Sequence, residues 1–293
     1  MTRLRQGFGG QARMRQDVGG QDPARQGSGG QGATNGGNGN GNGNGGKGSS
    51  PAIRLEGVSK AFNDKKVLDD ITLEVAEGTG FCLLGRSGTG KSVTLKHIMG
   101  LLRSDSGKVY VHGKDVTALT GLELAEVRRS MGFLFQNSAL FDSISVGENV
   151  AFPMRRHTDW PDAKIREAAK GKLAEVGLDK DYDKMPGDLS GGMRKRAGLA
   201  RAMALDPDIL LVDEPSAGLD PITSDEIDQL LVDLKKKGTT IVAVTHNIPS
   251  ARHIGDQLAM LHEGHLIAQG TAEEFDKSDN EMVRAFMRSE GSG

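Results

Sequence analysis

The chain has 293 residues, of which 36% are hydrophobic and 26% charged, as is ordinary for a soluble globular protein of one large or two small domains. Residues 1–50 hold 17 of the 42 glycines and a net charge of +4, so residues 51–293 carry a net charge of −6. A mildly acidic folded part lacks the basic surface of nucleic-acid-binding proteins, so we expect no nucleic-acid partner. Its apolar runs are far shorter than the ~20 residues of a membrane-spanning helix, so we do not expect it to span a bilayer.

Residues 1–50 read as a tail of low complexity. A ten-residue repeat runs through Arg5–Gln11, Arg15–Gln21 and Arg25–Gln31, and Asn35–Gly46 contains only Asn and Gly. Such a segment has too little apolar surface to offset its ordering entropy, so we predict a disordered Gly/Asn/Gln-rich tail. We interpret it as a dispensable extension; a tether to anionic lipid or RNA through its arginines is the alternative.

The single cysteine, Cys82, excludes an intrachain disulfide and lies in the apolar run Phe81–Leu84. We predict a buried strand thiol in a reducing compartment. The first residues lack both the apolar segment of a signal peptide and the amphipathic character of a transit peptide, so we expect a cytoplasmic protein.

Strands of two kinds are predicted from Ile53 onward. Apolar and polar residues alternate from Ile71 to Val75, which is typical of a half-exposed antiparallel strand. Phe81–Leu84, Ile209–Val212 and Ile241–Val244 are instead continuous apolar runs, as expected of parallel strands covered on both faces. Together they indicate an α/β nucleotide-binding core with an antiparallel β layer at its N-terminal side.

Helical segments complete the predicted organisation. Residues 136–188 contain helix-like stretches such as Lys164–Val176, which indicates an inserted α-helical subdomain within a domain spanning 51–270. The C-terminal extension, 271–293, has apolar residues at helical spacing and packs either on its own domain or on a partner.

The segment Gly85–Ser92 fits the phosphate-loop pattern, because it follows a buried strand and begins a helix-like stretch. Its glycines let the backbone curl until its N–H groups face phosphate oxygens. Lys91 adds a positive charge, and the Ser92 hydroxyl is a ligand for Mg²⁺. The loop therefore predicts a nucleotide bound through its phosphates together with Mg²⁺, and the identity of the nucleotide as ATP is implied by the family resemblance given below.

Two adjacent acids, Asp213 and Glu214, end the apolar run that begins at Ile209. We predict that Asp213 holds Mg²⁺, directly or through water, and that Glu214 polarises the attacking water as general base. Because side chains alternate along a strand, the two carboxylates are expected on different faces, with roles that are not interchangeable.

Gln136 and His246 also follow predicted strands. The Gln136 amide ends the strand Met131–Phe135 and is expected to reach the metal or the water, and His246 follows Ile241–Val244 and is expected to hydrogen-bond a γ-phosphate oxygen. Alone, such residues are more often a surface amide and a loop histidine. Their order relative to the phosphate loop favours the functional interpretation.

The segment Leu189–Met193, 24 residues before Asp213, is a second glycine-rich helix start. It offers backbone N–H groups and the Ser190 hydroxyl to phosphate, and it need not serve the nucleotide that the first loop holds. The basic run Arg194–Arg196 that follows is interpreted as the solvated face of its helix, without a role.

Over residues 52–270 the chain resembles an ABC-type ATPase subunit, with the phosphate loop, Gln136, Leu189–Met193, Asp213-Glu214, Ala217–Asp220 and His246 all in family order. The resemblance implies a head-to-tail dimer in which Ser190 and Gly192 of one subunit close over ATP held by the other. Phe62 matches the aromatic that stacks on adenine; an ordinary core phenylalanine is the alternative. The predicted cofactor-binding residues are Phe62, Gly85, Arg86, Ser87, Gly88, Thr89, Gly90, Lys91, Ser92, Val93, Ser190, Gly191, Gly192 and Asp220. The predicted catalytic residues are Lys91, Gln136, Glu214 and His246, and the predicted metal ligands are Ser92, Gln136 and Asp213.

A finer resemblance is to the ATPases of MCE-type lipid transporters, including the Mla phospholipid system. It rests on Phe133–Gln136, Ala139–Phe141, Glu148–Pro153, Met193 in place of the commoner glutamine, and Asp220–Thr223. It implies an integral-membrane permease, an MCE-type lipid-binding protein and, in the Mla branch, a small STAS-domain protein as partners. It also implies a peripheral location at the cytoplasmic face of the inner membrane.

The family docks its permease in the region after Gln136, so Phe141 and Phe152 are candidate contacts, with local core as the alternative. The alternative is that the chain is the ATPase of a transporter with another cargo, such as an amino acid, an ion or a lipoprotein. A soluble ATP-gated clamp on nucleic acid or ribosomes would instead require two cassettes or a long coiled coil, and the sequence has one cassette and no sustained heptads.

Overall fold

A computed structural model describes residues 51–289 of the chain. The predicted tail, residues 1–50, and the end of the C-terminal extension, residues 290–293, lie outside the described residues. Within 51–289, none of the helices combines the length and the apolar character that crossing a membrane requires.

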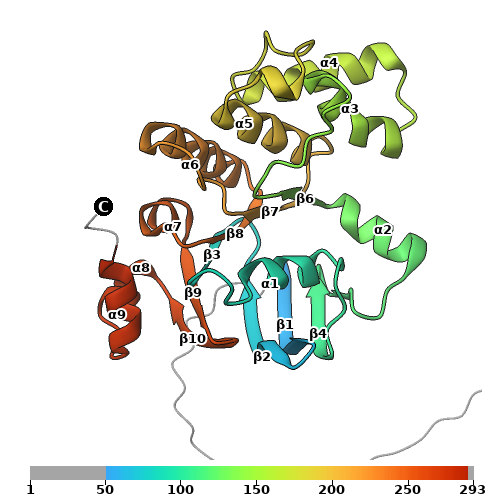
Figure 1. The fold of residues 1–293 in the computed structure, drawn as a ribbon. Helices are drawn as coiled ribbons and strands as arrows, with labels where there is room; N and C mark the ends of the chain where they lie inside the picture. Colours follow the sequence, from blue (N-terminus) through green and yellow to red (C-terminus); the bar gives the residue numbers. More distant parts are fainter. Residues whose placement is uncertain (1–50, 290–293) are drawn as a thin grey trace, which may run out of the picture. The chain divides into compact units, whose positions relative to one another are not determined.

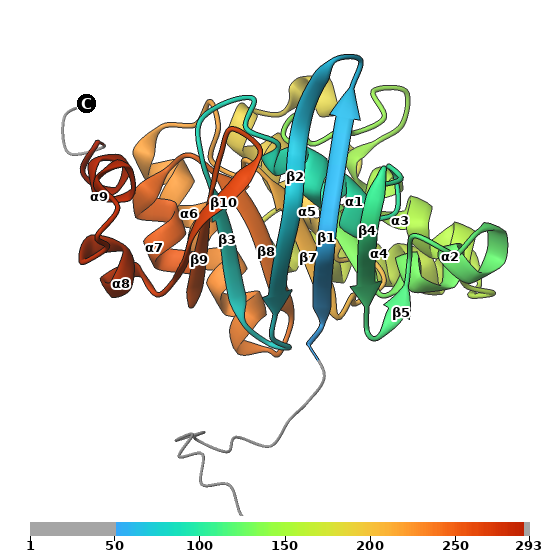
Figure 2. The same cartoon turned by 90° about the horizontal axis from the view of Figure 1, so that it is seen from below.

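An antiparallel sheet forms the N-terminal β layer, with strand order β2-β1-β4-β5 (Figure 2). The predicted alternation is confirmed: Ile71, Leu73 and Val75 are buried, and the two residues between them are exposed. This pattern gives the sheet one face for the core and one for water. Its strands are β1 (Ile53–Phe62), β2 (Lys65–Val75), β4 (Ser106–Val111) and β5 (Lys114–Asp115).

A six-stranded sheet of order β10-β9-β3-β8-β7-β6 forms the centre of the domain. Pairing is parallel from β9 to β6, and only β10 is antiparallel. The three continuous apolar runs of the sequence are confirmed as parallel strands, and every residue of β3, β7 and β8 is buried. The strands are β3 (Gly80–Leu84), β6 (Met131–Leu134), β7 (Ile209–Asp213), β8 (Thr240–Thr245), β9 (Gln257–His262) and β10 (His265–Gly270).

Two hydrophobic cores lie on opposite faces of this sheet, because successive side chains of a strand point to opposite sides. In β3, Phe81 and Leu83 pack in the core shared with the antiparallel sheet, whereas Cys82 and Leu84 pack in the core formed with the helices. Helix α1 (Lys91–Ile98) contacts β4, β7 and β8 and therefore lies between the two sheets (Figure 1). The phosphate loop that precedes α1 is fixed by both layers.

Three helices pack together above the sheet in Figure 1; two lie within the predicted helical segment 136–188, and the third begins after it at Gly191. The predicted helix Lys164–Val176 corresponds to α4, which runs from Asp162 to Glu175. The buried Asn149 accepts a hydrogen bond from the Phe141 N–H at 2.7 Å and donates one to the Phe141 carbonyl at 3.0 Å, so it fixes the loop before α3. The group comprises α3 (Val146–His157), α4, the 3-10 turn η1 (Pro186–Asp188) and α5 (Gly191–Ala202).

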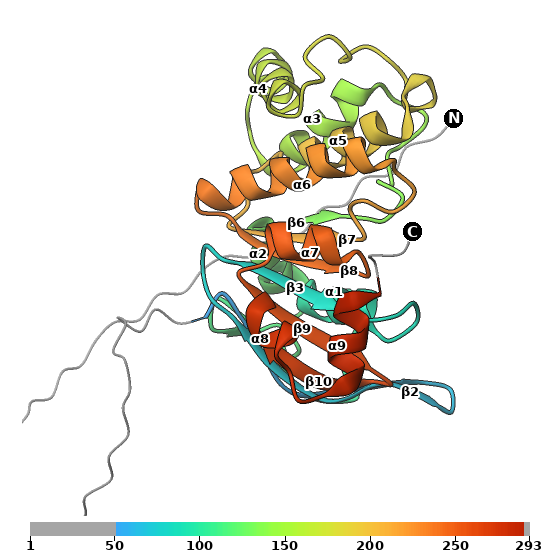
Figure 3. The ribbon, with the colours of Figure 1, turned by 90° about the vertical axis from the view of Figure 1, so that its left-hand side faces the viewer.

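The C-terminal extension packs on its own domain within the described residues. Phe275, Val283 and Met287 are buried in the helical core, and Met282 remains 45% exposed. Helix α8 lies against β9 and β10, and α9 packs on α8 (Figure 3). The remaining helices are α2 (Gly121–Arg129), α6 (Pro221–Lys236), α7 (Ile248–Ile254), α8 (Ala272–Asp276) and α9 (Glu281–Arg288).

Burial in β3 makes the only thiol of the chain unreactive. Cys82 has no exposed surface, and this burial, with the nearby Asp228 carboxylate, raises the pKa of the thiol to about 12. Because the thiolate is the reactive form, we expect negligible labelling of the native chain by a disulfide reagent at mildly alkaline pH. The chain unfolded in guanidinium chloride should react with one equivalent of the reagent. Rapid labelling of the native chain would contradict the burial of this strand.

Candidate active site

The carboxyl ends of four parallel strands meet at one edge of the six-stranded sheet. The phosphate loop follows β3, His246 follows β8, Asp213 ends β7, and Gln136 lies two residues after β6. Ligands of open α/β sheets bind at this edge. The fold therefore gathers at one place four elements that lie far apart in the sequence.

The phosphate loop needs glycine at two positions where its backbone passes close to other chain segments. A Cβ on Gly85 would lie 2.5 Å from the Leu261 carbonyl oxygen, and one on Gly90 would lie 2.8 Å from the Val67 carbonyl oxygen. Both residues also have positive φ, of 151° and 106°. By contrast, a Cβ on Gly88 would meet nothing within 4 Å. The loop is thus a cradle of bare backbone, which suits a phosphate chain.

Lys91 lies inside this cradle and is only 5% exposed. Its Nζ donates hydrogen bonds to the carbonyls of Gly85 at 2.8 Å and Arg86 at 3.2 Å. The same Nζ is 3.4 Å from the Glu214 carboxylate. A fixed positive charge therefore stands between the loop and the general base predicted from the sequence.

The two acids after β7 have different partners. Asp213 accepts a hydrogen bond from the Ser92 hydroxyl at 2.8 Å, and burial raises the pKa of its carboxyl. Glu214 is 2.9 Å from Nδ1 of His246 through its second carboxylate oxygen. Their divergence does not come from strand alternation, since β7 ends at Asp213 and Glu214 has a left-handed φ of 49°. A turn, rather than the strand, directs the Glu214 carboxylate toward Lys91.

Three other predicted residues are exposed. His246 has a side chain that is 60% exposed, and Gln136 is exposed at the end of β6. Among the described residues, Gln136 makes no hydrogen bond to Ser92 or Asp213. Phe62, at the end of β1, is 42% exposed and has Lys60 Nζ 5.6 Å from its ring centroid. Its exposure contradicts the alternative of an ordinary core phenylalanine.

The second glycine-rich segment begins α5. Ser190 is the N-cap and accepts a hydrogen bond from the Met193 N–H at 3.2 Å, and Gly191 is exposed beside it. Gly192 packs so closely on α6 that a Cβ would lie 2.4 Å from the Thr223 methyl group. Among the described residues, no hydrogen bond or ion pair joins this segment to the phosphate loop of the same chain.

Asp220 caps α6. Its carboxylate accepts hydrogen bonds from the Thr223 hydroxyl at 2.6 Å and from the Thr223 N–H at 3.0 Å, and these bonds lower the pKa of the carboxyl. The predicted cofactor-binding residue therefore has a local structural task at the start of a helix.

The interpretation of Arg194–Arg196 as a solvated helix face is wrong for Lys195. This lysine is 5% exposed, and its Nζ donates a hydrogen bond to the Glu214 carbonyl at 2.8 Å. Burial lowers its pKa, against the opposing effect of the Asp213 and Glu214 carboxylates. A signal was present in the sequence: Gly192, Lys195 and Leu199 are spaced to share one helix face, which is the buried one.

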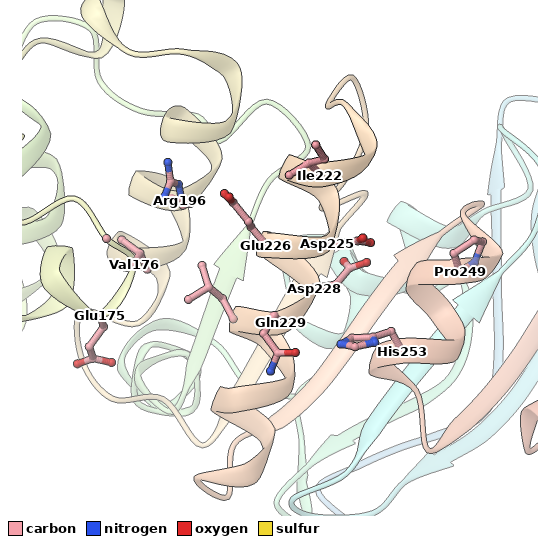
Figure 4. A pocket seen from close by; sticks show the side chains of 12 residues that line it. Glu175, Val176, Arg196, Ile222, Asp225, Glu226, Asp228, Gln229, Pro249 and His253 are labelled. Carbon is pink, nitrogen blue, oxygen red and sulfur yellow. The ribbon is translucent and has the colours of Figure 1, made fainter.

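A separate cavity of about 820 Å³ lies between α5, α6 and α7, and none of the predicted site residues line it (Figure 4). Arg196 borders it on the α5 side, and Asp228 and His253 lie on the α6 and α7 side. It shares no lining residue with the phosphate loop. The candidate site for chemistry is therefore the centre formed by Glu214, Lys91 and His246.

Comparison with known proteins agrees with this geometry. Residues 68–217 match the family model described as ABC transporter. The chain belongs to this family. It is the ATP-hydrolysing subunit of an ABC transporter, with the α/β fold of an ABC ATPase cassette.

Individual relatives cover most of the cassette. The chain is 45% identical over 237 residues to the probable ribonucleotide transport ATP-binding protein mkl of Mycobacterium leprae, covering 80% of this chain and 68% of that protein. It is 39% identical over 242 residues to the intermembrane phospholipid transport system ATP-binding protein MlaF of Haemophilus influenzae, covering 82% and 92%. Among solved structures, the cassette MJ0796, dimeric in a post-hydrolysis state with ADP and Pi, superposes with a TM-score of 0.70 at 32% identity, covering 75% and 98%.

The two loop glycines provide a matched test of the cradle. We expect Gly85→Ala to lower the melting temperature and abolish binding of a fluorescent ATP analogue, because its Cβ would overlap a backbone oxygen that cannot rotate away. Gly88→Ala has open space and should cost only the left-handed strain of about 1–2 kcal/mol. Equal stability and equal nucleotide binding of the two variants would contradict the close approach at Gly85.

Proposed function

We propose that the chain is the ATPase of a lipid transporter, acting as a head-to-tail homodimer beneath an integral-membrane permease at the cytoplasmic face of the inner membrane. The observation that carries the hydrolytic part is the Glu214 carboxylate between Lys91 and His246. A carboxylate beside a phosphate cradle is placed to take a proton from water, and the flanking cation and imidazole orient it.

Each side chain of this centre has a task. Lys91 exchanges its bonds to the loop carbonyls for phosphate oxygens and neutralises charge that develops on them. Glu214 accepts the proton of the attacking water. His246 donates to Glu214 through Nδ1, which leaves Nε2 free to contact a γ-phosphate oxygen. Gln136, exposed at the next strand end, orients the water.

Mg²⁺ fits the oxygen pair formed by the Ser92 hydroxyl and the Asp213 carboxylate. The described residues contain no group of three or more His, Cys, Asp or Glu side chains able to hold a metal ion alone. Mg²⁺ commonly takes one or two protein oxygens and completes its coordination with phosphates and water. Such an ion would neutralise phosphate charge, and it would also stabilise the ionised form of the buried Asp213.

The dimer follows from the second helix start. Ser190 and Gly191 are exposed at the N-terminus of α5, where free N–H groups favour an anion. In the proposed dimer, the nucleotide that they serve is the one bound by a second subunit. The dimeric MJ0796 cassette supports this arrangement.

A groove beside Gln136 is the proposed permease site. Phe141 and Phe152 are 45% and 48% exposed, with ring centroids 5.1 Å apart, so neither ring is local core. They line a cavity of about 570 Å³ together with Arg201, which donates hydrogen bonds to the Ser138 and Ala139 carbonyls, both at 2.7 Å. Aromatic rings displayed to solvent, here Phe141 on a loop and Phe152 on α3, are typical of a protein–protein contact.

Lipid as the cargo is supported by the MlaF relative and by the sequence features shared with MCE-type transporters. An MCE-type lipid-binding protein, and a STAS-domain protein if the system is of Mla type, complete the proposed assembly. The mkl relative is named for ribonucleotide transport, which makes a soluble solute the competing cargo. If the cargo is an amino acid, an ion or a lipoprotein, the chain would likewise be bound to a permease other than that of an MCE-type lipid transporter.

Replacing Glu214 by glutamine tests the hydrolytic centre. The amide keeps the shape of the carboxylate but cannot take the proton, so turnover should fall by a factor of about 10²–10⁴ while ATP still binds. With Mg-ATP the variant should accumulate as a dimer in size-exclusion chromatography with light scattering. Glu226→Gln, the same change on the exposed face of α6, is the control and should hydrolyse ATP normally. A monomeric variant in saturating Mg-ATP would count against the shared site.

Co-purification from native membranes tests the cargo and the docking groove together. We expect a permease, an MCE-type protein and phospholipid in mass spectra of the purified complex. Phe141→Ser combined with Phe152→Ser should lose these partners, whereas Ile222→Ser, which removes a 75% exposed side chain from α6, should retain them. Recovery of a solute permease without any MCE-type protein would refute the lipid assignment and leave the ATPase intact.

A further inference from the structure

The backbone of Glu214 is in a conformation that needs external support. Its φ of 49° is in the left-handed region, which is uncommon for residues other than glycine, and the next residue is Pro215, which further restricts the backbone before it. Such strain persists only where surrounding contacts determine the conformation, and it is concentrated at functional sites.

Three hydrogen bonds hold this peptide in place. The Glu214 N–H donates to the Val244 carbonyl at 2.9 Å, and the Glu214 carbonyl accepts from the Ala217 N–H at 3.3 Å and from Lys195 Nζ at 2.8 Å. Of the two hydrogen bonds to the Glu214 carbonyl, the one from Lys195 is the shorter. It is also the only one of the three backbone-supporting bonds that a side chain donates. A hydrogen bond from a charged donor is also stronger than one between neutral groups.

Burial of the Lys195 ammonium carries a desolvation cost that its interactions must offset. An ammonium group with 5% of the residue exposed has lost most of its hydration, and lysine is almost never buried unless paired. Its described hydrogen bond goes to the Glu214 carbonyl rather than to a carboxylate. A methionine or leucine would fill the same space without this desolvation, so packing alone does not account for a lysine here.

We propose that Lys195 is a positioning residue for ATP hydrolysis: it holds the Glu214 peptide in its left-handed turn and thereby directs the Glu214 carboxylate toward Lys91 and His246. The inference rests on the proposed role of Glu214 as general base. Glu214 is then fixed by two lysines, with Lys91 at its carboxylate and Lys195 at its carbonyl.

Because Lys195 lies on α5, an experiment can distinguish its positioning of Glu214 from a purely structural role in the helix. The same helix begins at Gly191, beside Ser190, and this end serves the nucleotide of the opposite subunit in the proposed dimer. A lysine that only stabilised α5 would affect that opposite site. A lysine that positions Glu214 affects the site of its own subunit.

The first measurement is steady-state hydrolysis by full-length single variants. Lys195→Met should lower kcat about 10–100-fold, the size of effect that a small misplacement of a catalytic group produces, with the KM for ATP changed less than about 3-fold. Lys195→Arg keeps a charged donor and should recover most of the rate. Lys236→Met, on the exposed face of α6, is the matched control and should resemble the parent chain. If the methionine variant does not fold, Lys195→Gln takes its place with the same expected split between kcat and KM.

The second measurement uses tandem fusions of two full-length chains, with Glu214→Gln in one copy so that a single site turns over. Lys195→Met in the copy that retains Glu214 should reduce the remaining hydrolysis, and in the Glu214→Gln copy it should leave that hydrolysis unchanged. Reduction from the Glu214→Gln copy, or from neither copy, would overturn the positioning role. Hydrolysis that survives Glu214→Gln in both copies would instead refute the proposed base, and this inference with it.

Discussion

The shared edge of the six-stranded parallel sheet is the constraint on which this cassette depends. Parallel pairing of β3, β8, β7 and β6 brings four carboxyl ends to one side, and each end carries a residue of the candidate site. The sheet is buried on both faces by two separate hydrophobic cores, so these ends have little freedom to move. Catalytic geometry is therefore a consequence of strand packing.

Electrostatics at that edge are arranged around one carboxylate. Glu214 contacts a buried lysine through its side chain and a second buried lysine through its carbonyl, and His246 bounds it on the exposed side. Both lysines lose hydration in these buried positions, and only their interactions with the groups that they face offset this desolvation cost. The turn at Glu214 separates its carboxylate from that of Asp213, so the base and the proposed metal ligand have different surroundings although they are adjacent in sequence.

Helix α5 connects this centre to the surfaces through which the subunit would work. Its first residues are exposed at the proposed dimer face, Lys195 reaches the turn at Glu214, and Arg201 near its end fixes the loop that displays Phe141. One helix thus contacts the proposed dimer face, the acid centre and the proposed permease groove.

Local patterns determined much of this protein. Continuous apolar runs identified β3, β7 and β8, alternation identified β2, and glycine spacing identified the phosphate loop, because these signals arise from each residue's own backbone and burial preferences. Only the tertiary structure decided that Glu214 leaves its strand in a left-handed turn and that Lys195 is buried. Those features depend on contacts between segments far apart in the chain: Val244 and Lys195 meet at Glu214 only after β8 and α5 have packed. The basic run Arg194–Arg196 is therefore interpreted as solvated from its sequence alone, whereas in the fold Lys195 packs against the turn at Glu214.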